Sequence, residues 1–280
     1  MKYSKSLLLL FFFLFVSSAY PQELSDDMPK IFFRNEKTIA LNLNSNGWGL
    51  GYRYGSRINV FEKHIYETDF SVLKHPKEVN SSNASFLSSE SFVFGKLNSV
   101  FDLRFGYGKQ NELFVKRDLK SVAVRYFYSV GPSIAFRKPV YYEILYPVND
   151  SVFGIREEKF NPAIHTAADI NGKASFFKGF NEITIVPGLF AKGGFNFEFS
   201  QKENIIHALE AGVMIQAYLE DLEIMAVDDN QQFYFTLFIT YRLGKVVNAQ
   251  QLSPEYLKRR KNKFLFFNGL LNIQNERAYF

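Results

Sequence analysis

The sequence contains no cysteine, and beyond Gln22 it contains no long uninterrupted apolar run. Without cysteine the chain has neither a disulfide framework nor a cysteine for lipidation, so its fold depends on non-covalent contacts. A membrane helix needs about 18 or more consecutive apolar residues, so only strands could carry the remaining chain across a membrane. Internal repeats and low-complexity linkers are also absent from the sequence, and we therefore expect one large β-domain.

Positive charge is in modest excess, with a formal net charge of +5 and a pI of about 9.1. The excess is concentrated in the N-terminal segment and in the cluster Lys258–Lys263. A nucleic-acid surface would need its basic residues on one face of the folded domain. We therefore expect no nucleic-acid partner.

The N-terminus has the pattern of a secretory signal peptide. Lys2 and Lys5 precede an apolar stretch over residues 7–16, which leads into a small-residue cleavage pattern ending at Ala19. The stretch is shorter than a membrane helix requires, and Pro21 follows it closely. We expect a signal peptide over residues 1–19, cleaved after Ala19, rather than an uncleaved anchor.

Aromatic residues are abundant, with 32 Phe and 16 Tyr, and they alternate with polar residues. The segment 233–243 shows this best: one face carries Phe233, Phe235, Leu237, Ile239 and Tyr241. Thr236, Thr240 and Arg242 fall on the other face, which is the period of a strand. A tilted strand of this length is about what a bilayer crossing needs, so we interpret it as the last strand of a transmembrane barrel.

The same alternation recurs along the chain in nine further segments. They are 38–44, 48–54, a third strand that follows residues 55–57 and ends at about residue 73, 92–94, 101–107, 121–130, 134–144, 181–200 and 209–219. We interpret Gly131-Pro132 as a turn between two of these strands. The predicted fold is all-β: a transmembrane antiparallel up-and-down β-barrel of about 10 strands (8–12). It would occupy residues 38–243, between an N-terminal periplasmic segment (20–37) and a C-terminal periplasmic tail (244–280).

Two observations favour a membrane barrel over a soluble β-sandwich. The apolar faces carry more aromatic bulk than the interior of a small barrel can hold, whereas lipid accepts it. The connections after the third, fifth, seventh and ninth predicted strands are long and polar, and those after the second, fourth, sixth and eighth are short. Outer-membrane barrels have long outer loops and short periplasmic turns, so both chain ends should lie in the periplasm. Only the turn 45–47 departs from this rule.

The longest connection, 146–180, should contain a short helix, because Asn161-Pro162 is a helix start signal and Asn171-Gly172 a stop signal. His165 and Asp169 would stand four apart on it, where they could align as a ligand pair or as a base and its orienting carboxylate. A solvated helix face is the simpler interpretation. Since the sequence holds no metal-spacing or nucleophile motif, we expect no metal, no cofactor and no catalytic residue.

Charged residues fall on the inward faces of the predicted strands. These residues are Arg53, Glu67, Asp69, Asp102, Arg104, Arg125, Arg137, Glu143, Glu182, Lys192, Glu198, Glu210 and Arg242. Six bases against seven acids are nearly balanced. We therefore predict a packed lumen ion-pair network rather than a wide selective pore.

The tail joins a basic cluster to an aromatic one. Its residues are Lys258, Arg259, Arg260, Lys261, Lys263, Phe264, Phe266 and Phe267. Such a segment could lie on anionic phospholipid of the inner leaflet or dock a periplasmic partner. A disordered basic tail is the alternative.

Several segments resemble an outer-membrane β-barrel family of Bacteroidota of unknown function. They are GWGLGYRYG at Gly47–Gly55, KHPKE at Lys74–Glu78, FGKLNS at Phe94–Ser99, RYFYS at Arg125–Ser129 and PGLFAKGGFNFEF at Pro187–Phe199. The resemblance covers most of the chain beyond the signal peptide. It implies a β-barrel in the outer membrane of a Gram-negative cell, and it carries over no functional residue.

The sequence thus predicts a non-enzymatic outer-membrane β-barrel, structural or a component of a membrane assembly, with its lumen occluded by ion pairs. Its partners would be outer-membrane lipid and a protein of the periplasm or outer membrane. One alternative is a small-solute or lipid transporter or porin. The other is an outer-membrane lipid-modifying enzyme, which would need a serine, a histidine and an acid to meet at the lipid boundary.

Overall fold

A computed structural model of the chain describes residues 34–59, 61–83, 90–116, 121–149, 152–202, 204–227 and 230–248. The predicted signal peptide, most of the N-terminal segment and the basic and aromatic cluster of the tail lie outside the described residues.

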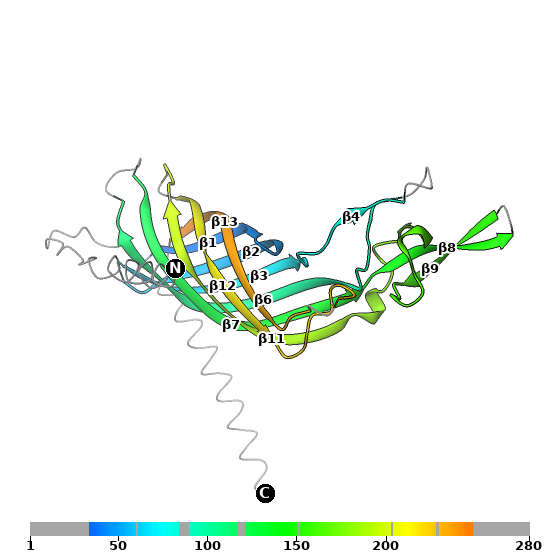
Figure 1. Ribbon diagram of the computed structural model, residues 1–280. Coiled ribbons are helices and arrows are strands. Elements are labelled where there is room, and N and C mark those ends of the chain that lie inside the picture. Colours follow the sequence, from blue (N-terminus) through cyan, green and yellow to red (C-terminus); the bar gives the residue numbers. More distant parts are fainter. Residues whose placement is uncertain are drawn as a thin grey trace, which may run out of the picture. The chain divides into compact units, whose positions relative to one another are not determined.

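Eight antiparallel strands close into a barrel, and neighbours in the barrel follow one another along the chain (Figure 1). The strands are β1 (Arg34–Asn44), β2 (Gly47–Arg57), β3 (Glu62–Leu73), β6 (Asn98–Phe114), β7 (Ala123–Pro139), β11 (Thr184–Glu198), β12 (Ile205–Tyr218) and β13 (Phe233–Asn248). The barrel closes where β1 pairs with β13, from Arg34 opposite Asn248 to Asn44 opposite Phe238. The predicted up-and-down antiparallel barrel is therefore confirmed, with strands that begin before residue 38 and end after residue 243.

The predicted number of about ten strands is too high, because two predicted strands are one. β7 runs straight through Gly131-Pro132, and both residues pair with β11, opposite Phe190 and Leu189. A Cβ on Gly131 would lie 1.9 Å from the carbonyl oxygen of Phe105 on β6, so this glycine serves a close approach of two backbones. The glycine and proline that signalled a turn are thus part of the ladder.

The predicted strand at 92–94 is also not part of the barrel. Only Phe92 and Val93 are extended there; they form β5 (Phe92–Val93), which pairs with β4 (Asn80–Ser81) outside the barrel sheet. Phe92 is buried with Tyr142 and Phe160 in a separate apolar cluster. Of the apolar residues that suggested a bilayer-facing strand, Phe92 is therefore buried within the connections, whereas Phe94 is exposed.

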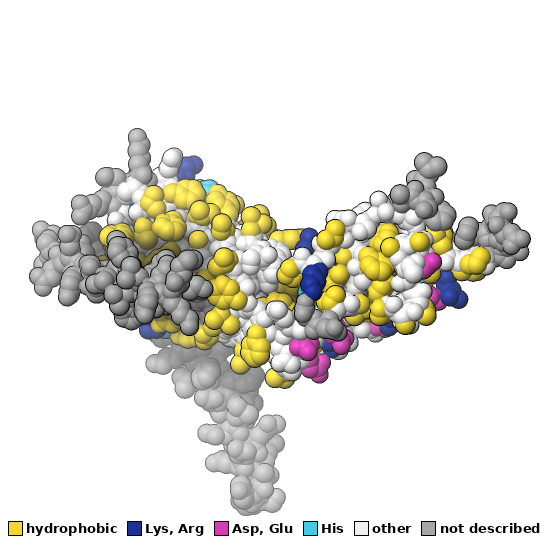
Figure 2. Space-filling view, in the orientation of Figure 1, with side chains coloured by type: hydrophobic (Ala, Val, Ile, Leu, Met, Phe, Trp, Pro, Cys, Tyr) yellow, Lys and Arg dark blue, Asp and Glu magenta, His cyan; other side chains and the backbone are white. Residues whose placement is uncertain are grey.

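Burial in the barrel is the reverse of that in a soluble protein. Outward-facing Phe233 and Ile39 are 68% and 62% exposed, whereas inward-facing Glu210 and Arg242 are 0% and 2% exposed. Hydrophobic side chains are spread over much of the face that Figure 2 shows. The period-two pattern of the sequence therefore places apolar side chains outside and charged side chains inside.

The two rims of the barrel differ. At one rim, the terminal rim, β1 begins and β13 ends, and the connections there are short, at 58–61, 115–122 and 199–204. The opposite rim, the loop rim, carries the connections 74–97, 140–183 and 219–232, together with the tight turn 45–46. The long and short connections therefore segregate, with the first hairpin as the exception. The connection predicted to be long at 108–120 does not follow the prediction, because it is the short connection 115–122 of the terminal rim.

A small sheet lies in the longest connection. β8 (Tyr141–Asn149) pairs with β9 (Val152–Lys159) on one side and with β10 (Ile170–Lys173) on the other. Its apolar cluster contains Tyr142, Ile144, Phe160 and Ile170, together with Phe92 of β5. This connection therefore has a core of its own at the loop rim.

The short helix predicted between Asn161 and Gly172 is wrong. The segment forms turns and a single 3₁₀ turn, η1 (Ala167–Asp169), before it enters β10. The Asn161 side chain accepts a hydrogen bond from the Ala163 amide at 3.0 Å, and such local bonding competes with a helix. A second 3₁₀ turn, η2 (Phe180–Glu182), precedes β11. None of the helical turns in the described part of the chain is long and apolar enough to span a membrane.

Candidate functional site

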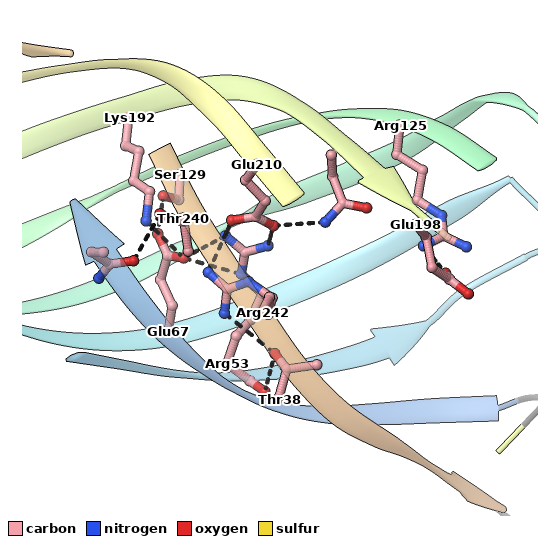
Figure 3. Close-up of polar contacts among 12 residues, drawn as sticks. Thr38, Arg53, Glu67, Arg125, Ser129, Lys192, Glu198, Glu210, Thr240 and Arg242 are labelled. Atoms are coloured by element: carbon pink, nitrogen blue, oxygen red, sulfur yellow. Dashed lines mark hydrogen bonds and ion pairs between the residues drawn. The ribbon is translucent and has the colours of Figure 1, made fainter. Parts of the chain in front are cut away.

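A cluster of six charged side chains fills the middle of the barrel, which we call the central cluster. It consists of Arg53, Glu67, Asp69, Lys192, Glu210 and Arg242. Figure 3 labels all of them except Asp69. These residues come from β2, β3, β11, β12 and β13, and each follows from the inward phase of its strand. Three cations face three carboxylates, so the cluster is neutral when all six groups are ionised.

Glu210 accepts hydrogen bonds from two guanidinium groups. Its Oε1 lies 2.5 Å from Arg53 Nη1, and its Oε2 lies 3.0 Å from Arg242 Nη2. Asn196 Nδ2 donates a third bond to Oε1 at 2.8 Å. The carboxylate is thus fully buried and held by several charge-assisted hydrogen bonds, which are among the stronger ones in proteins.

Arg53 also joins Glu210 to the opposite part of the cluster. Its Nε and Nη2 donate to Glu67 Oε2 at 3.1 and 2.9 Å. Lys192 Nζ lies 2.9 Å from Asp69 Oδ2 and 3.5 Å from Glu67 Oε2. The acids and bases therefore form one continuous network across the lumen instead of isolated pairs.

Neutral side chains complete the network. Ser129 Oγ donates to Glu67, and Thr240 Oγ1 donates to Asn42 Oδ1 at 2.8 Å. The guanidinium carbon of Arg53 lies 4.7 Å from the centre of the inward-facing Phe127 ring, within range of a cation–π contact. A Cβ on Gly51 would lie 2.1 Å from Asp69 Oδ1, so this small residue leaves the room that the carboxylate occupies.

A second charged group lies toward the terminal rim. Arg125 pairs with Glu198 and, at 3.3 Å, with Glu112. Lys63 pairs with Glu36 close to the first rung of the barrel. Figure 3 shows Arg125 and Glu198 apart from the central cluster.

Apolar side chains close the lumen toward the loop rim. Leu222, Ile224 and Met225, from the connection 219–232, are buried against inward-facing Val100 and Val186 of the barrel wall. Below this apolar cap, Asp102 accepts from Arg104 Nη1 at 2.9 Å and from Gln216 Nε2 at 2.8 Å. A loop therefore folds into the barrel mouth and covers the charged interior.

A small cavity lies between the central cluster and the terminal rim. Its volume is about 10 Å³, and its lining includes Glu36, Arg53, Arg125 and Arg242. A single water needs at least about 10–15 Å³ of such space. The cavity has room for about one water and not for an organic solute.

Three residues predicted for the lumen network lie elsewhere. Arg137, near the end of β7, pairs with Glu220 at 3.2 Å and with Glu223 at 3.8 Å at the loop rim. Glu143 lies on β8 and accepts from Asn171 at 2.9 Å, and Glu182 lies in η2, where it pairs with Lys159. The strand pattern in the sequence runs to the loop rim at Arg137 and past the barrel wall at Glu143 and Glu182, so it could not exclude these residues.

His165 and Asp169 do not form the pair considered from the sequence. His165 Nε2 lies 3.4 Å from Glu158, and its Nδ1 accepts from the Asn161 amide at 3.1 Å. Asp169 caps the turn by accepting from the Thr166 amide and hydroxyl at 2.8 and 2.7 Å, which lowers the pKa of its carboxyl. Among the described residues no group of three or more His, Asp or Glu side chains is placed to hold a metal.

Some network residues were missed from the sequence. Glu36 was assigned to the N-terminal segment and Glu112 to a loop, although both lie on strands with inward phase. Lys63 and Ser129 lie within two predicted strands, on their inward faces, but were not included in the predicted network. Extending the period-two patterns at 38–44 and 101–107 would have found Glu36 and Glu112.

No family model matches the chain, and no curated protein matches it. Among solved structures, it is similar to the attachment invasion locus protein Ail of Yersinia pestis, in complex with the heparin analogue sucrose octasulfate. That match has 10% identity and a TM-score of 0.34, and it covers 77% of this chain and 98% of Ail. Neisserial surface protein A matches with 11% identity and a TM-score of 0.36, covering 77% and 97% of the two chains.

The fold and the site together define a class of protein. The chain forms a closed, antiparallel eight-stranded β-barrel with an apolar exterior and a charged, packed interior.

Proposed function

We propose that this protein is a non-enzymatic outer-membrane β-barrel, structural or part of a membrane assembly, whose lumen is closed to solutes. The observation that carries the proposal is the reversed burial of the barrel, with apolar side chains outside and charges inside. Export by a signal peptide over residues 1–19 belongs to the same proposal.

The apolar exterior favours lipid as the surrounding medium. On β13 alone, five outward-facing side chains are at least 39% exposed; they are Phe233, Phe235, Leu237, Ile239 and Tyr241. Moving one large apolar side chain out of water contributes about 1.5–3 kcal/mol. The free energy of removing the exposed face of this single strand from water is thus comparable with the whole free energy of unfolding of a typical domain, about 5–15 kcal/mol. A bilayer removes this surface from water.

Polar aromatic groups near the terminal rim fit a membrane interface. The Tyr107 hydroxyl lies 2.6 Å from His64 Nδ1, and Tyr66 packs against Tyr107. His207 Nδ1 lies 3.0 Å from the hydroxyl of Tyr241. Aromatic residues with one polar end are typical of both boundaries of membrane barrels.

The filled interior favours a structural role over transport. The central cluster, the apolar cap and the cavity of about 10 Å³ lie on the inward side of the barrel strands. A pore for solutes would need a continuous aqueous path, which barrels of about eight strands rarely have room for. The transporter and lipid-modifying enzyme hypotheses remain alternatives without a specific feature in their favour.

Cell fractionation tests the proposal. The protein should be recovered with outer membranes, and its unheated gel band should migrate differently from its heated band, because closed barrels resist unfolding by detergent. Recovery as a soluble periplasmic protein would contradict the proposed location.

A further inference from the structure

Two lysines at the loop rim have no carboxylate partner among the described residues. Lys138, near the end of β7, is 2% exposed, and its nearest hydrogen-bond acceptor is the Pro139 carbonyl at 3.4 Å. Lys173, at the end of β10, is exposed, and its amine lies 5.9 Å from the centre of the Phe176 ring. The two amines also repel each other.

Other lysines of the same connection are neutralised. Lys178 pairs with Glu157, and Lys159 pairs with Glu182. Burial first, and then the nearby Lys96, lower the pKa of Lys173, whereas Glu78 raises it. Lys138 and Lys173 therefore form a local positive site without an ion-paired carboxylate among the described residues, and the buried cation of Lys138 is costly without a counter-charge.

Aromatic rings surround this positive site. Phe176, Phe177 and Phe180 pack against one another with centroid distances of 5.4–6.2 Å, and Phe177 is 79% exposed. The Lys138 amine lies 5.0 and 5.4 Å from the centres of the Phe176 and Phe180 rings. The cations are thus held at the edge of an exposed apolar cluster.

The ring cluster is continuous with the outward face of the barrel. Phe176 makes an edge-to-face contact with Phe101 of β6 at 6.3 Å, and Phe101 stacks on Phe70 of β3 at 6.0 Å. A soluble anion would meet the lysines equally well without these exposed rings. A ligand that combines an anionic head with apolar chains meets both features at once.

We propose that Lys138 and Lys173, with the rings of Phe176, Phe177 and Phe180, bind the phosphate group of an anionic lipid in the leaflet around the loop rim. The exposed Lys173 ammonium donates to the phosphate oxygens, the buried Lys138 adds its positive charge behind it, and the rings lie against the first part of the acyl chains. This proposal rests on the proposed membrane location, so its test must separate headgroup binding from insertion.

The single tryptophan provides the measurement. Trp48 faces outward, and it lies in the same row as Phe101, because Trp48 pairs with Val72 and Val72 pairs with Phe101. Two strand spacings of about 4.8 Å each separate Trp48 from Phe101 across the sheet. Lipids with brominated acyl chains quench tryptophan at short range, so Trp48 reports which lipids gather on this side of the barrel.

The full-length protein is reconstituted into phosphatidylcholine vesicles that contain a minor fraction of brominated lipid. Quenching by brominated phosphatidylcholine measures insertion itself. Brominated phosphatidic acid at the same fraction should quench Trp48 more strongly, because the site enriches it. We call the additional quenching by brominated phosphatidic acid over brominated phosphatidylcholine the excess quenching. Attraction of a lipid phosphate by one lysine enriches the lipid about fivefold, so Lys173→Gln should reduce the excess quenching about fivefold.

Lys178→Gln is the matched control, since it removes a charge from the same connection that Glu157 already neutralises. It should leave the excess quenching unchanged. Lys138→Gln should act as Lys173→Gln does, and if it fails to fold, the exposed Lys173 still decides the result. Equal quenching by the two brominated lipids, an unchanged excess in Lys173→Gln, or loss of the excess on adding inorganic phosphate would each overturn the lipid site. Absence of quenching by phosphatidylcholine would instead contradict the membrane location.

Discussion

Neutralising Glu210 should destabilise the barrel strongly, because two guanidinium groups share this one carboxylate. In Glu210→Gln, Arg53 keeps Glu67 as a charged partner, but Arg242 loses its ion-paired carboxylate and keeps the Thr38 hydroxyl at 3.2 Å. The central cluster would then carry three cations and two carboxylates. Since its side chains are at most 4% exposed, water cannot screen the surplus charge.

Removing one partner of a buried ion pair costs about 3–5 kcal/mol. At about 1.4 kcal/mol per power of ten, this lowers the folding equilibrium constant by roughly two to four powers of ten. The double variant Glu210→Gln/Arg242→Met restores a balanced cluster and should recover part of the loss. Lys109→Ala breaks the exposed pair with Glu62 at the terminal rim and should change stability little.

Equilibrium unfolding by urea in lipid vesicles, followed by Trp48 fluorescence and by the unheated gel band, measures these differences. Glu210→Gln should unfold at a clearly lower urea concentration than the parent and the Lys109→Ala variant. If Glu210→Gln and Lys109→Ala unfold together, the buried network does not stabilise the barrel. If the double variant is no more stable than Glu210→Gln, charge imbalance is not the cause.

Four further predictions concern the pore, the topology, the tail and the loop. The purified protein in planar bilayers should show no steady conductance, and stable single-channel currents would favour the transporter hypothesis. Protease added to intact cells should cleave within 147–180 and leave the terminal-rim connections uncut, whereas cleavage near Arg259 would contradict the topology. Removing residues 249–280 should leave an inserted, heat-modifiable barrel, because β13 keeps all its pairings with β1 up to Asn248; loss of the barrel would show that the tail contributes to it. Hydrogen bonds from Lys159 and Tyr141 lower the pKa of Glu182. Ionised Glu182 therefore stabilises the turn η2 at pH values above the ordinary carboxyl pKa, and this stabilisation is lost as the pH falls through the lowered pKa of the folded protein. Hydrogen exchange at 180–183, corrected for its intrinsic rate, should therefore rise at low pH in the parent but not show this dependence in Glu182→Gln.

The sequence by itself determined which way most side chains of the barrel point. Strand side chains alternate between two faces, so Phe235 and Ile239 could be separated from Thr240 and Arg242 without knowledge of any partner strand. The direction of a side chain is a local property, and local sequence is enough to predict it. The rim of a connection is not, because the extra strand predicted at 92–94 placed the connection at 108–120 on the wrong rim.

Only the tertiary structure decided the number of strands. Gly131-Pro132 has the composition of a turn, but its backbone pairs with β11, and Gly131 admits the Phe105 carbonyl from β6. Phe92 alternates like a barrel residue but packs with Tyr142 and Phe160 in the long connection. Whether an apolar residue faces lipid or a local core depends on its neighbours in space, which a periodic pattern does not contain.

The tertiary structure also decided which charges meet. The sequence placed Arg53 and Glu210 on inward faces, but their contact joins residues on strands that are three positions apart around the barrel. Closure of the barrel brings them together across the lumen, while Arg137 and Glu143, with a similar local pattern, lie beyond the charged interior. The pattern sets the direction of each side chain, and the radius and register of the closed barrel set its partner.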